Sequence, residues 1–484
     1  MMKSIAKIAT IALLGLSVAN ARLMRRFTRK HHDYLMVENP QSSTNDNLWY
    51  DQRNNHFSKS DITTWKQQYT VNTTFWGGSG YPIFVMLGGE GPMGTRTLSG
   101  GYIINEYASR AKAMLLSIEH RFYGSSIPGD GTLSTANLKK YLSADQALAD
   151  YVELISYIKK TYNTKDSKVV TFGGSYSGSL SAWIRQKYPH IVHAALSSSA
   201  PVLAQVDFPE YFEVLKAAIG DKCATRIRVA TTRIESMMKS AAGKKQLESD
   251  FQTCTPITDE EDEVTFLESL ADGTAGVVQY SDDANALGRG YNIAKMCKII
   301  CDGNDPYQAF RNFTLDYMAF SGEECIAASH ANEIKDLKNT DPTAPTASMR
   351  SWYFQTCAEY GYYQTIESDD MMFSQRIELK YFLNLCAEAY DIDPTEPDVS
   401  AKYTNVYYGG RNPKSSRIVF TNGSVDPWHA LGNIVDFDEK MPVYYINGTA
   451  HCADLYKATP EDIPGLTEAR TKTWEKLSQW LKEN

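Results

Sequence analysis

The feature that most constrains the fold of this chain is a strand-like run that stops at two glycines. Val169-Val-Thr-Phe172 is mainly apolar and rich in β-branched residues, and Gly173-Gly174 follows it directly before Ser175. Apolar residues then recur at helical spacing, at Leu180, Trp183, Ile184 and Tyr188. A strand that turns sharply into a helix, with small residues around a serine, holds that serine out at the end of the strand. The segment therefore predicts a strand–turn–helix unit with Ser175 on the turn.

Similar strand-like runs lie on both sides of this unit. They occupy residues 83–87, 113–118, 194–197, 417–421 and 443–446. The stretch 144–158 has apolar residues at a helical period, and a closing helix is expected around 471–481. Strands that alternate with helices favour a mostly parallel sheet with helices on both faces. We therefore expect an α/β fold.

The middle of the chain, residues 206–400, has a different character. It is rich in helix formers and contains seven of the eight cysteines, namely Cys223, Cys254, Cys297, Cys301, Cys325, Cys357 and Cys386. We interpret this part as a helical insertion between two halves of one sheet, residues 45–205 and 401–484. Cys452 is left as the odd cysteine and a candidate free thiol. Zinc is the competing interpretation of Cys297-x-x-x-Cys301, but no histidine stands at ligand spacing nearby, so we expect no metal site.

The first 44 residues are typical of a targeting segment. Lys3 and Lys7 precede an apolar run at 8–18, and Ala19-Asn-Ala21 has the small-x-small pattern that signal peptidase cleaves. We expect a signal peptide over 1–21 and a basic leader or pro-segment over 22–44. The apolar run is shorter than the roughly 20 residues that span a bilayer, so no membrane anchor is expected. Secretion would place the cysteines in an oxidising compartment, where disulfides form.

A serine hydroxyl becomes a nucleophile when a histidine takes its proton and an acid orients that histidine. Asp426 follows the run 417–421, and His451 follows the run 443–446. Serine, acid and histidine thus occur in the chain order of α/β-hydrolases, each after a strand. We predict that Ser175, Asp426 and His451 form a catalytic triad.

Two rivals of these residues are less well placed. Ser177 would lie on the helix beyond the turn, without glycines beside it. His429 is three residues past Asp426 and precedes the last strand, so it is expected to pack in its loop. Neither is preferred over the residues of the predicted triad.

The oxyanion formed during acyl transfer needs two backbone N–H donors. The residue after the nucleophile, Tyr176, supplies the first. The second is expected from Gly88 or Gly89, which follow the strand-like run 83–87, and Glu90 should lie close by in the cleft.

Asn-x-Ser/Thr triplets provide candidate glycosylation sites at Asn72, Asn312 and Asn447. A fourth triplet begins at Asn422. A glycan there would lie close to Asp426, so we predict that this site is unused.

Several of these segments together resemble the serine peptidase family of lysosomal Pro-X carboxypeptidase, dipeptidyl peptidase II and thymus-specific serine protease. The resemblance extends from about Trp49 to the C-terminus and is carried by residues 51–57, 88–92, 119–124, 173–178 and 422–428 and by the His451 loop. The sequence is most similar to the thymus-specific type, because small residues follow the Ser-Tyr pair and Cys452 follows the histidine.

The resemblance implies an α/β-hydrolase with an inserted helical, disulfide-bonded cap domain. It implies hydrolysis of peptide bonds, often beside proline, by an exopeptidase of the secretory pathway, extracellular or lysosomal. The segment 352–362 resembles one that helps to form the substrate cleft, so Trp352, with Glu90 and Trp428, is a substrate-cleft candidate. The same segment suggests a disulfide between Cys357 and Cys386.

The expected partner is a peptide substrate, with no cofactor. A net charge of −8 and a pI near 5.7, without a sustained basic run after the N-terminus, argue against nucleic-acid binding. Whether substrates are cleaved from the amino or the carboxyl end, and whether the chain forms a homodimer, stay open. Two alternative functions are a secreted esterase or lipase on the same fold, because a triad alone does not choose amide over ester, and a non-catalytic binding protein.

Overall fold

An eight-stranded sheet forms the centre of the computed structural model, which describes residues 47–93, 98–282, 290–368, 370–437 and 439–483. The strand order is β1-β2-β4-β3-β5-β6-β9-β10. β1 and β2 form an antiparallel hairpin at one edge, β2 also pairs antiparallel with β4, and all other pairs are parallel. The strands are β1 Leu48–Arg53, β2 Thr64–Asn72, β3 Ile83–Leu87, β4 Met114–Ile118, β5 Val169–Gly174, β6 Ala194–Ser198, β9 Ile418–Gly423 and β10 Val443–Ile446.

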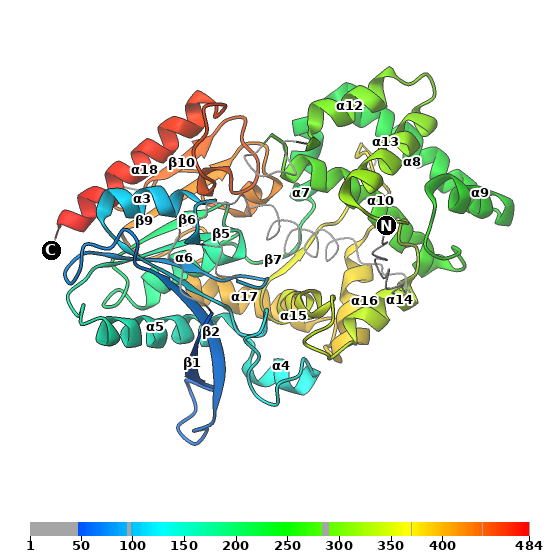
Figure 1. Cartoon of the computed structure of the whole chain (residues 1–484). Helices are drawn as coiled ribbons and strands as arrows, with labels where there is room; N and C mark the ends of the chain where they lie inside the picture. Colours follow the sequence, from blue (N-terminus) through cyan, green and yellow to red (C-terminus); the bar gives the residue numbers. More distant parts are fainter. Residues whose placement is uncertain (1–46, 94–97, 283–289, 369, 438, 484) are drawn as a thin grey trace, which may run out of the picture.

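Helices cover both faces of this sheet (Figure 1). α3 (Ile103–Ala111) and α18 (Pro464–Lys482) pack on one face, and α5 (Ala144–Thr161) and α6 (Tyr176–Lys187) pack on the other. Successive side chains of a strand point to opposite faces, and β3, β4 and β5 are almost completely buried. This explains why their sequences are apolar runs without alternation.

The chain leaves the sheet after β6 and returns to it at β9. The residues between them form a helical cap, drawn in green and yellow beside the sheet in Figure 1. This region also contains a short parallel pair, β7 (Gln205–Asp207) and β8 (Gly361–Tyr363). The helices are α7 Glu210–Ile219, α8 Asp221–Met238, α9 Ala241–Phe251, α10 Glu260–Gln279, α12 Ile293–Asp302, α13 Pro306–Ser321, α14 His330–Leu337, α15 Ala347–Gln355, the π-helix η3 Thr356–Tyr360, α16 Leu379–Tyr390 and α17 Glu396–Tyr408.

Three disulfides lie in the cap: Cys223–Cys297, Cys254–Cys325 and Cys357–Cys386. Cys301 and Cys452 are in no disulfide. The expected fold class, an α/β-hydrolase with an inserted helical, disulfide-bonded cap, is thereby confirmed. The domain limits at 205/206 and 400/401 stay a prediction.

The expected signal peptide and basic leader, residues 1–44, lie outside the described residues. Within the described ranges, no helix is both long and apolar enough to cross a membrane.

Three further short helices are present in the described part of the chain, one before α5 and two after β9 and β10. α4 (Thr135–Tyr141) precedes α5, and its N-terminus is capped by Ser134, whose hydroxyl accepts from the Asn137 N–H. The 3₁₀ helices η4 (Pro427–Leu431) and η5 (Ala453–Leu455) follow β9 and β10. The residues predicted for catalysis therefore lie in loops at one end of the sheet.

Candidate active site

Ser175 lies on the turn between β5 and α6. Its φ of 59° and ψ of −133° are values that residues other than glycine rarely adopt. Its backbone N–H donates to the Ser198 carbonyl oxygen of β6 at 2.9 Å. A Cβ on Gly173 would lie 2.0 Å from the Ser177 carbonyl oxygen, and one on Gly178 would lie 2.7 Å from that of Ser198. These two glycines let α6 begin directly against the sheet, which leaves Ser175 partly exposed at the turn.

The hydroxyl of Ser177 has a structural task. Ser177 Oγ donates to the Gly174 carbonyl oxygen at 2.9 Å and accepts from the Gly174 N–H at 3.0 Å. Both bonds tie the first turn of α6 to the end of β5. A hydroxyl held in this way is poorly suited to attack a substrate.

Asp426 and His451 meet where the loops after β9 and β10 lie side by side. His451 Nδ1 is 2.9 Å from Asp426 Oδ1, and both side chains are buried. Asp426 Oδ1 also accepts the Trp428 N–H at 3.0 Å, which caps η4. The two loops are joined by a bond from the Val425 N–H to the Thr449 carbonyl oxygen at 3.0 Å. Because a carboxylate only accepts, Nδ1 must carry the proton, and Nε2 is left as the basic nitrogen.

The electrostatics of His451 are dominated by two opposing effects. Burial favours the neutral imidazole, but the hydrogen-bonded Asp426 carboxylate and the neighbouring Cys452 together raise the pKa of His451 well above its ordinary value. Glu90 lies near enough to interact electrostatically with His451, and burial raises the pKa of this carboxyl. The ring of Tyr280, next to the C-terminus of α10, stands edge-on to His451 with centroids 5.8 Å apart.

The two glycine candidates for the oxyanion hole differ in the contacts that they make. The Gly88 N–H donates to the Ile118 carbonyl oxygen of β4 at 2.9 Å, so Gly89 is the better placed of the two candidates. A Cβ on Gly89 would lie 3.2 Å from Ser177 Cβ, so Gly89 packs against the first turn of α6. Tyr176 is the first residue of α6, where N–H groups have no acceptor within the helix. Tyr176 and Gly89 are the remaining candidate pair.

The side chain of Tyr176 joins the sheet to the cap. Its hydroxyl accepts from Gln355 Nε2 at 2.8 Å and lies 3.0 Å from His120 Nε2. His120 Nδ1 is 2.6 Å from the Arg121 carbonyl oxygen, so Nδ1 carries the proton and Nε2 accepts from Tyr176. Burial lowers the pKa of His120 to about 4, which keeps the ring neutral. Tyr123 completes the network by donating to Gln355 Oε1 at 2.6 Å.

Glu119 holds the glycine loop in place. Its carboxylate accepts from the Met93 N–H at 2.9 Å, the Ser125 N–H at 3.0 Å and Ser126 Oγ at 2.6 Å. Burial raises the pKa of Glu119 to about 7. The sequence motif at 119–124 therefore holds the backbone beside the candidate site through hydrogen bonds, a role that could not be assigned from the sequence alone.

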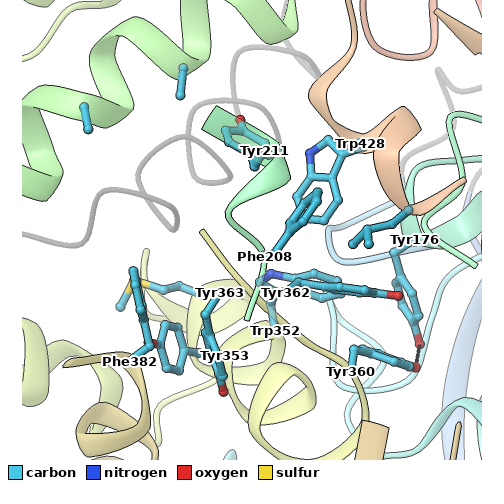
Figure 2. Close-up of a cluster of buried hydrophobic side chains, with 14 of the residues drawn as sticks. Tyr176, Phe208, Tyr211, Trp352, Tyr353, Tyr360, Tyr362, Tyr363, Phe382 and Trp428 are labelled. Carbon is cyan, nitrogen blue, oxygen red and sulfur yellow. Dashed lines mark hydrogen bonds between the residues drawn. The ribbon is translucent and has the colours of Figure 1, made fainter. Parts of the chain in front are cut away.

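The substrate-cleft candidates Trp352 and Trp428 belong to a buried aromatic cluster (Figure 2). Trp428 packs against Phe208 and Tyr362 with ring centroids 5.6 and 5.5 Å apart. Trp352 packs against Tyr176 at 5.3 Å. Trp352 is 8% exposed and Trp428 is 9% exposed, so each can offer only an edge to a substrate.

Sequence reasoning missed Asp454, whose carboxylate connects three elements. It accepts from Ser198 Oγ at 2.5 Å, at the end of β6, and from Thr421 Oγ1 at 2.8 Å, within β9. It thus ties the loop after His451 to the strand beside Ser175. The sequence contains no signal for this role, because an aspartate near a histidine is common. The Sγ of Cys452 also lies close, 2.8 Å from where a Cβ on Gly174 would be.

The candidate glycosylation sites differ in exposure. Asn312 and Asn447 are exposed. Asn72 is 3% exposed and its Nδ2 donates to the Leu98 carbonyl oxygen at 3.1 Å, so a glycan would require this side chain to leave its buried position. Asn422, which we expect to be unmodified, is also buried, with Nδ2 bonded to the Asn433 carbonyl oxygen. In the part of the chain that the structure describes, no group of three or more His, Cys, Asp or Glu could hold a metal ion.

The sequence matches the family described as Serine carboxypeptidase S28 over residues 52–473. The human thymus-specific serine protease is 33% identical over 449 residues, which cover 90% of this chain and 86% of that protein. The lysosomal Pro-X carboxypeptidase of Pongo abelii is 27% identical over 452 residues, which cover 90% of this chain and 88% of that protein. Among solved structures, a proline iminopeptidase of Mycobacterium smegmatis aligns with 90% of this chain and 99% of its own, with 12% identity and a TM-score of 0.35. The family resemblance seen in the sequence motifs is confirmed.

Proposed function

Because this chain belongs to the serine carboxypeptidase S28 family and is a serine-type peptidase, we propose that it cleaves peptides through Ser175, Asp426 and His451. The observation that carries this proposal is the Asp426–His451 hydrogen bond at the end of the sheet where Ser175 stands on its strained turn. Acid, base and nucleophile come from the loops after β9, β10 and β5. This is the arrangement that acyl transfer by a serine needs.

In the proposed mechanism, Ser175 attacks the carbonyl carbon of the scissile bond while His451 Nε2 takes its proton. Asp426 holds the imidazole through Nδ1 and stabilises the imidazolium that forms. The N–H groups of Tyr176 and Gly89 donate to the oxyanion. His451 then gives the proton to the leaving amine. Water, activated by the same histidine, resolves the acyl-enzyme.

We infer that the substrates are short peptides or chain ends, with a preference near proline. The helical cap beside the sheet would limit the length of chain that reaches the serine (Figure 1). The edges of Trp352 and Trp428, together with Tyr362, suit a compact apolar ring such as proline. The name of the Pro-X carboxypeptidase relative supports the same preference.

The three disulfides support passage through the secretory pathway, since such bonds persist in oxidising compartments. An extracellular or lysosomal location follows from this proposal and from the lysosomal relative. Signal-peptide removal after Ala21 is part of the same proposal.

Mass-spectrometric mapping of products from a mixed peptide library tests the proposed function. The purified protein and its Ser175→Ala and His429→Gln variants are compared. His429 Nδ1 lies 2.7 Å from the Asp426 carbonyl oxygen, so His429→Gln is a matched control that alters a nearby histidine without removing the proposed base. We expect cuts beside proline, near one chain end, from the wild type and the control only. Cleavage that persists in Ser175→Ala, or silence of the wild type, would overturn the proposal.

A further inference from the structure

Gln279, the last residue of the cap helix α10, contacts both loops that carry the proposed acid and base. Its Oε1 accepts from Tyr211 OH at 2.7 Å and from Trp428 Nε1 at 3.0 Å. Its backbone carbonyl oxygen accepts the His451 N–H at 2.9 Å. Gln279 is 5% exposed, so these hydrogen bonds are largely shielded from solvent. One cap residue is therefore hydrogen-bonded to the loop after β9 and to the loop after β10.

The contact with Trp428 continues directly to the acid. The backbone N–H of Trp428 donates to Asp426 Oδ1 at 3.0 Å, and this oxygen also accepts from His451 Nδ1 at 2.9 Å. The indole of Trp428 is held at its nitrogen by Gln279 and packs on the rings of Phe208 and Tyr211 (Figure 2). A shift of the indole would move the backbone group that orients Asp426.

The hydrogen bonds of Gln279 leave its amide a single orientation. Oε1 accepts from Tyr211 OH and from Trp428 Nε1, and Nε2 donates to Tyr280 OH at 2.5 Å. The indole N–H of Trp428 can only donate, so it requires the oxygen of the amide on its side. Turning the amide over would place its N–H₂ group against the indole N–H. The backbone carbonyl oxygen of Gln279 is one of those that an α-helix leaves without an internal donor at its C-terminus, and His451 supplies that donor.

The C-terminus of α10 also contributes to the electrostatics of His451. The carbonyl groups at the end of a helix carry a partial negative charge, which favours a nearby cation. This end of α10 lies against His451, which becomes an imidazolium during the proposed reaction. The contact between α10 and His451 therefore places a partial negative charge beside the ring and favours the imidazolium.

We propose that Gln279 is a positioning residue through which the docked cap fixes the Asp426–His451 pair in its working geometry. This inference rests on the proposed function of that pair. It makes the cap part of the catalytic assembly in addition to any role in limiting access. Substrate selection and catalytic geometry are then coupled, because the segment that covers the site also holds the base.

Two substitutions distinguish positioning from a general effect on folding. Gln279→Leu keeps a similar volume but removes the acceptor of Trp428 and Tyr211, so the Asp426 loop should loosen. Gln279→Glu keeps an acceptor oxygen for both donors and adds a negative charge near His451. The first change should weaken the hold of Asp426 on the imidazole, and the second should favour the imidazolium. The midpoint of the acid limb of the pH–rate profile should therefore move in opposite directions.

The rate of Ser175 labelling by a fluorophosphonate probe, measured between about pH 4 and pH 8, is the readout, because it does not require a known substrate. We expect Gln279→Leu to slow labelling by about 10- to 100-fold, as for small misplacements of catalytic groups, and to shift the acid limb to lower pH. Gln279→Glu should stay within about threefold of the wild type at its optimum, with the acid limb at higher pH. Peptide cleavage by the same variants should show the loss in kcat and little change in KM.

An acid limb and labelling rate of Gln279→Leu equal to those of the wild type would overturn the proposal. If that variant does not fold, an unchanged acid limb in Gln279→Glu would overturn it equally. The wild type and Ser175→Ala report separately on the proposed function. A wild type that labels at Ser175, beside Gln279 variants that behave identically to it, disproves the positioning role alone. A wild type that does not label disproves the triad itself.

Discussion

Asp426 Oδ1 lies 2.9 Å from His451 Nδ1, although the two residues stand 25 positions apart on different loops. The same oxygen accepts the Trp428 N–H, so a second hydrogen bond, independent of the imidazole, orients the carboxylate. Two bonds to one oxygen leave Asp426 little freedom to rotate. The proposed acid and base therefore form one preorganised unit.

Replacing Asp426 by asparagine should abolish most activity without unfolding the protein. The amide would have nearly the same shape, but its N–H₂ group would favour the wrong tautomer of His451. We expect kcat to fall by about 10⁴-fold with KM nearly unchanged, as when the acid of a serine triad is replaced in this way. Steady-state kinetics on the best library peptide measures this. Asp398→Asn, the same change at an exposed carboxylate, serves as the control. A loss below about tenfold in Asp426→Asn would contradict the role of the acid.

The activity of the wild type should fall as pH falls through the raised pKa of His451. In the proposed mechanism, His451 must be neutral to accept the Ser175 proton, and Asp426 favours its charged form. We therefore expect the acid limb of kcat/KM above the ordinary histidine pKa of about 6.5.

Glu90→Gln tests the second charge near the base. The electrostatic interaction between Glu90 and His451 favours the imidazolium, and the neutral amide removes it. The acid limb should move to lower pH, with the midpoint read from kcat/KM between about pH 4 and pH 8. A midpoint that does not move would show that Glu90 does not act on His451. Glu439→Gln, an exposed carboxylate replaced in the same way, should leave the profile unchanged.

The core of the sheet could be predicted from the sequence because burial on both faces makes each parallel strand an apolar run. The structure confirms the strand at residues 83–87 with the same ends, and the strand that starts at 169 extends two residues further, to Gly174. The hairpin β1–β2 was missed because its strands contain polar residues. Gln52 Nε2 donates to Gln67 Oε1 at 2.9 Å, so these buried side chains satisfy one another. Only the fold brings them together, and no local pattern predicts such a pair.

Part of the candidate site could likewise be predicted from the sequence, and part could not. Ser175, Asp426 and His451 stand after strands, and chain order suggested them before any contact was known. The choice between Gly88 and Gly89 needed the partner of the Gly88 N–H, which lies on another strand. The role proposed for Gln279 could not be predicted from the sequence, because a glutamine at the end of a helix has no motif. The two donors to its Oε1 are 68 and 149 residues away.

Asp150→Ala, outside the candidate active site, should strongly lower the free energy of unfolding. Asp150 accepts from Arg121 Nε and Nη2, each at 2.7 Å, and both side chains are fully buried. His56 Nε2 lies 2.7 Å from the same carboxylate. Removing the carboxylate leaves the Arg121 guanidinium buried without its counter-charge, which typically costs about 3–5 kcal/mol. Urea unfolding measures the loss, with Asp398→Ala, at an exposed ion pair with Lys402, as a control expected to change stability by less than about 1 kcal/mol. Equal stability of the two variants would contradict the prediction.

Glu359 should make the protein less stable as pH rises from acid towards neutral. Its carboxylate accepts from the Ala144 N–H at 2.8 Å and from Gln355 Nε2 at 2.9 Å, and burial raises its pKa from 4.5 to about 7. Because the folded pKa is the higher one, the native state binds the proton more tightly than the unfolded state. The resulting stabilisation is complete below pH 4.5 and is lost as pH rises through about 7.

Glu359→Gln removes this titration, so the unfolding free energy of the variant should depend less on pH over that window. The difference between the two pH dependences should approach about 3 kcal/mol, the value of a shift of this size. Urea unfolding at a series of pH values measures it. Glu439→Gln, at an exposed position, should follow the wild-type curve. Parallel curves for the wild type and Glu359→Gln would show that Glu359 does not titrate in this window. A steeper pH dependence of the unfolding free energy in the wild type would connect this titration to the contact between the sheet and the cap. The connection runs through Gln355 Nε2, which donates both to Glu359 and to the Tyr176 hydroxyl beside Ser175, so this contact would be strongest in acid.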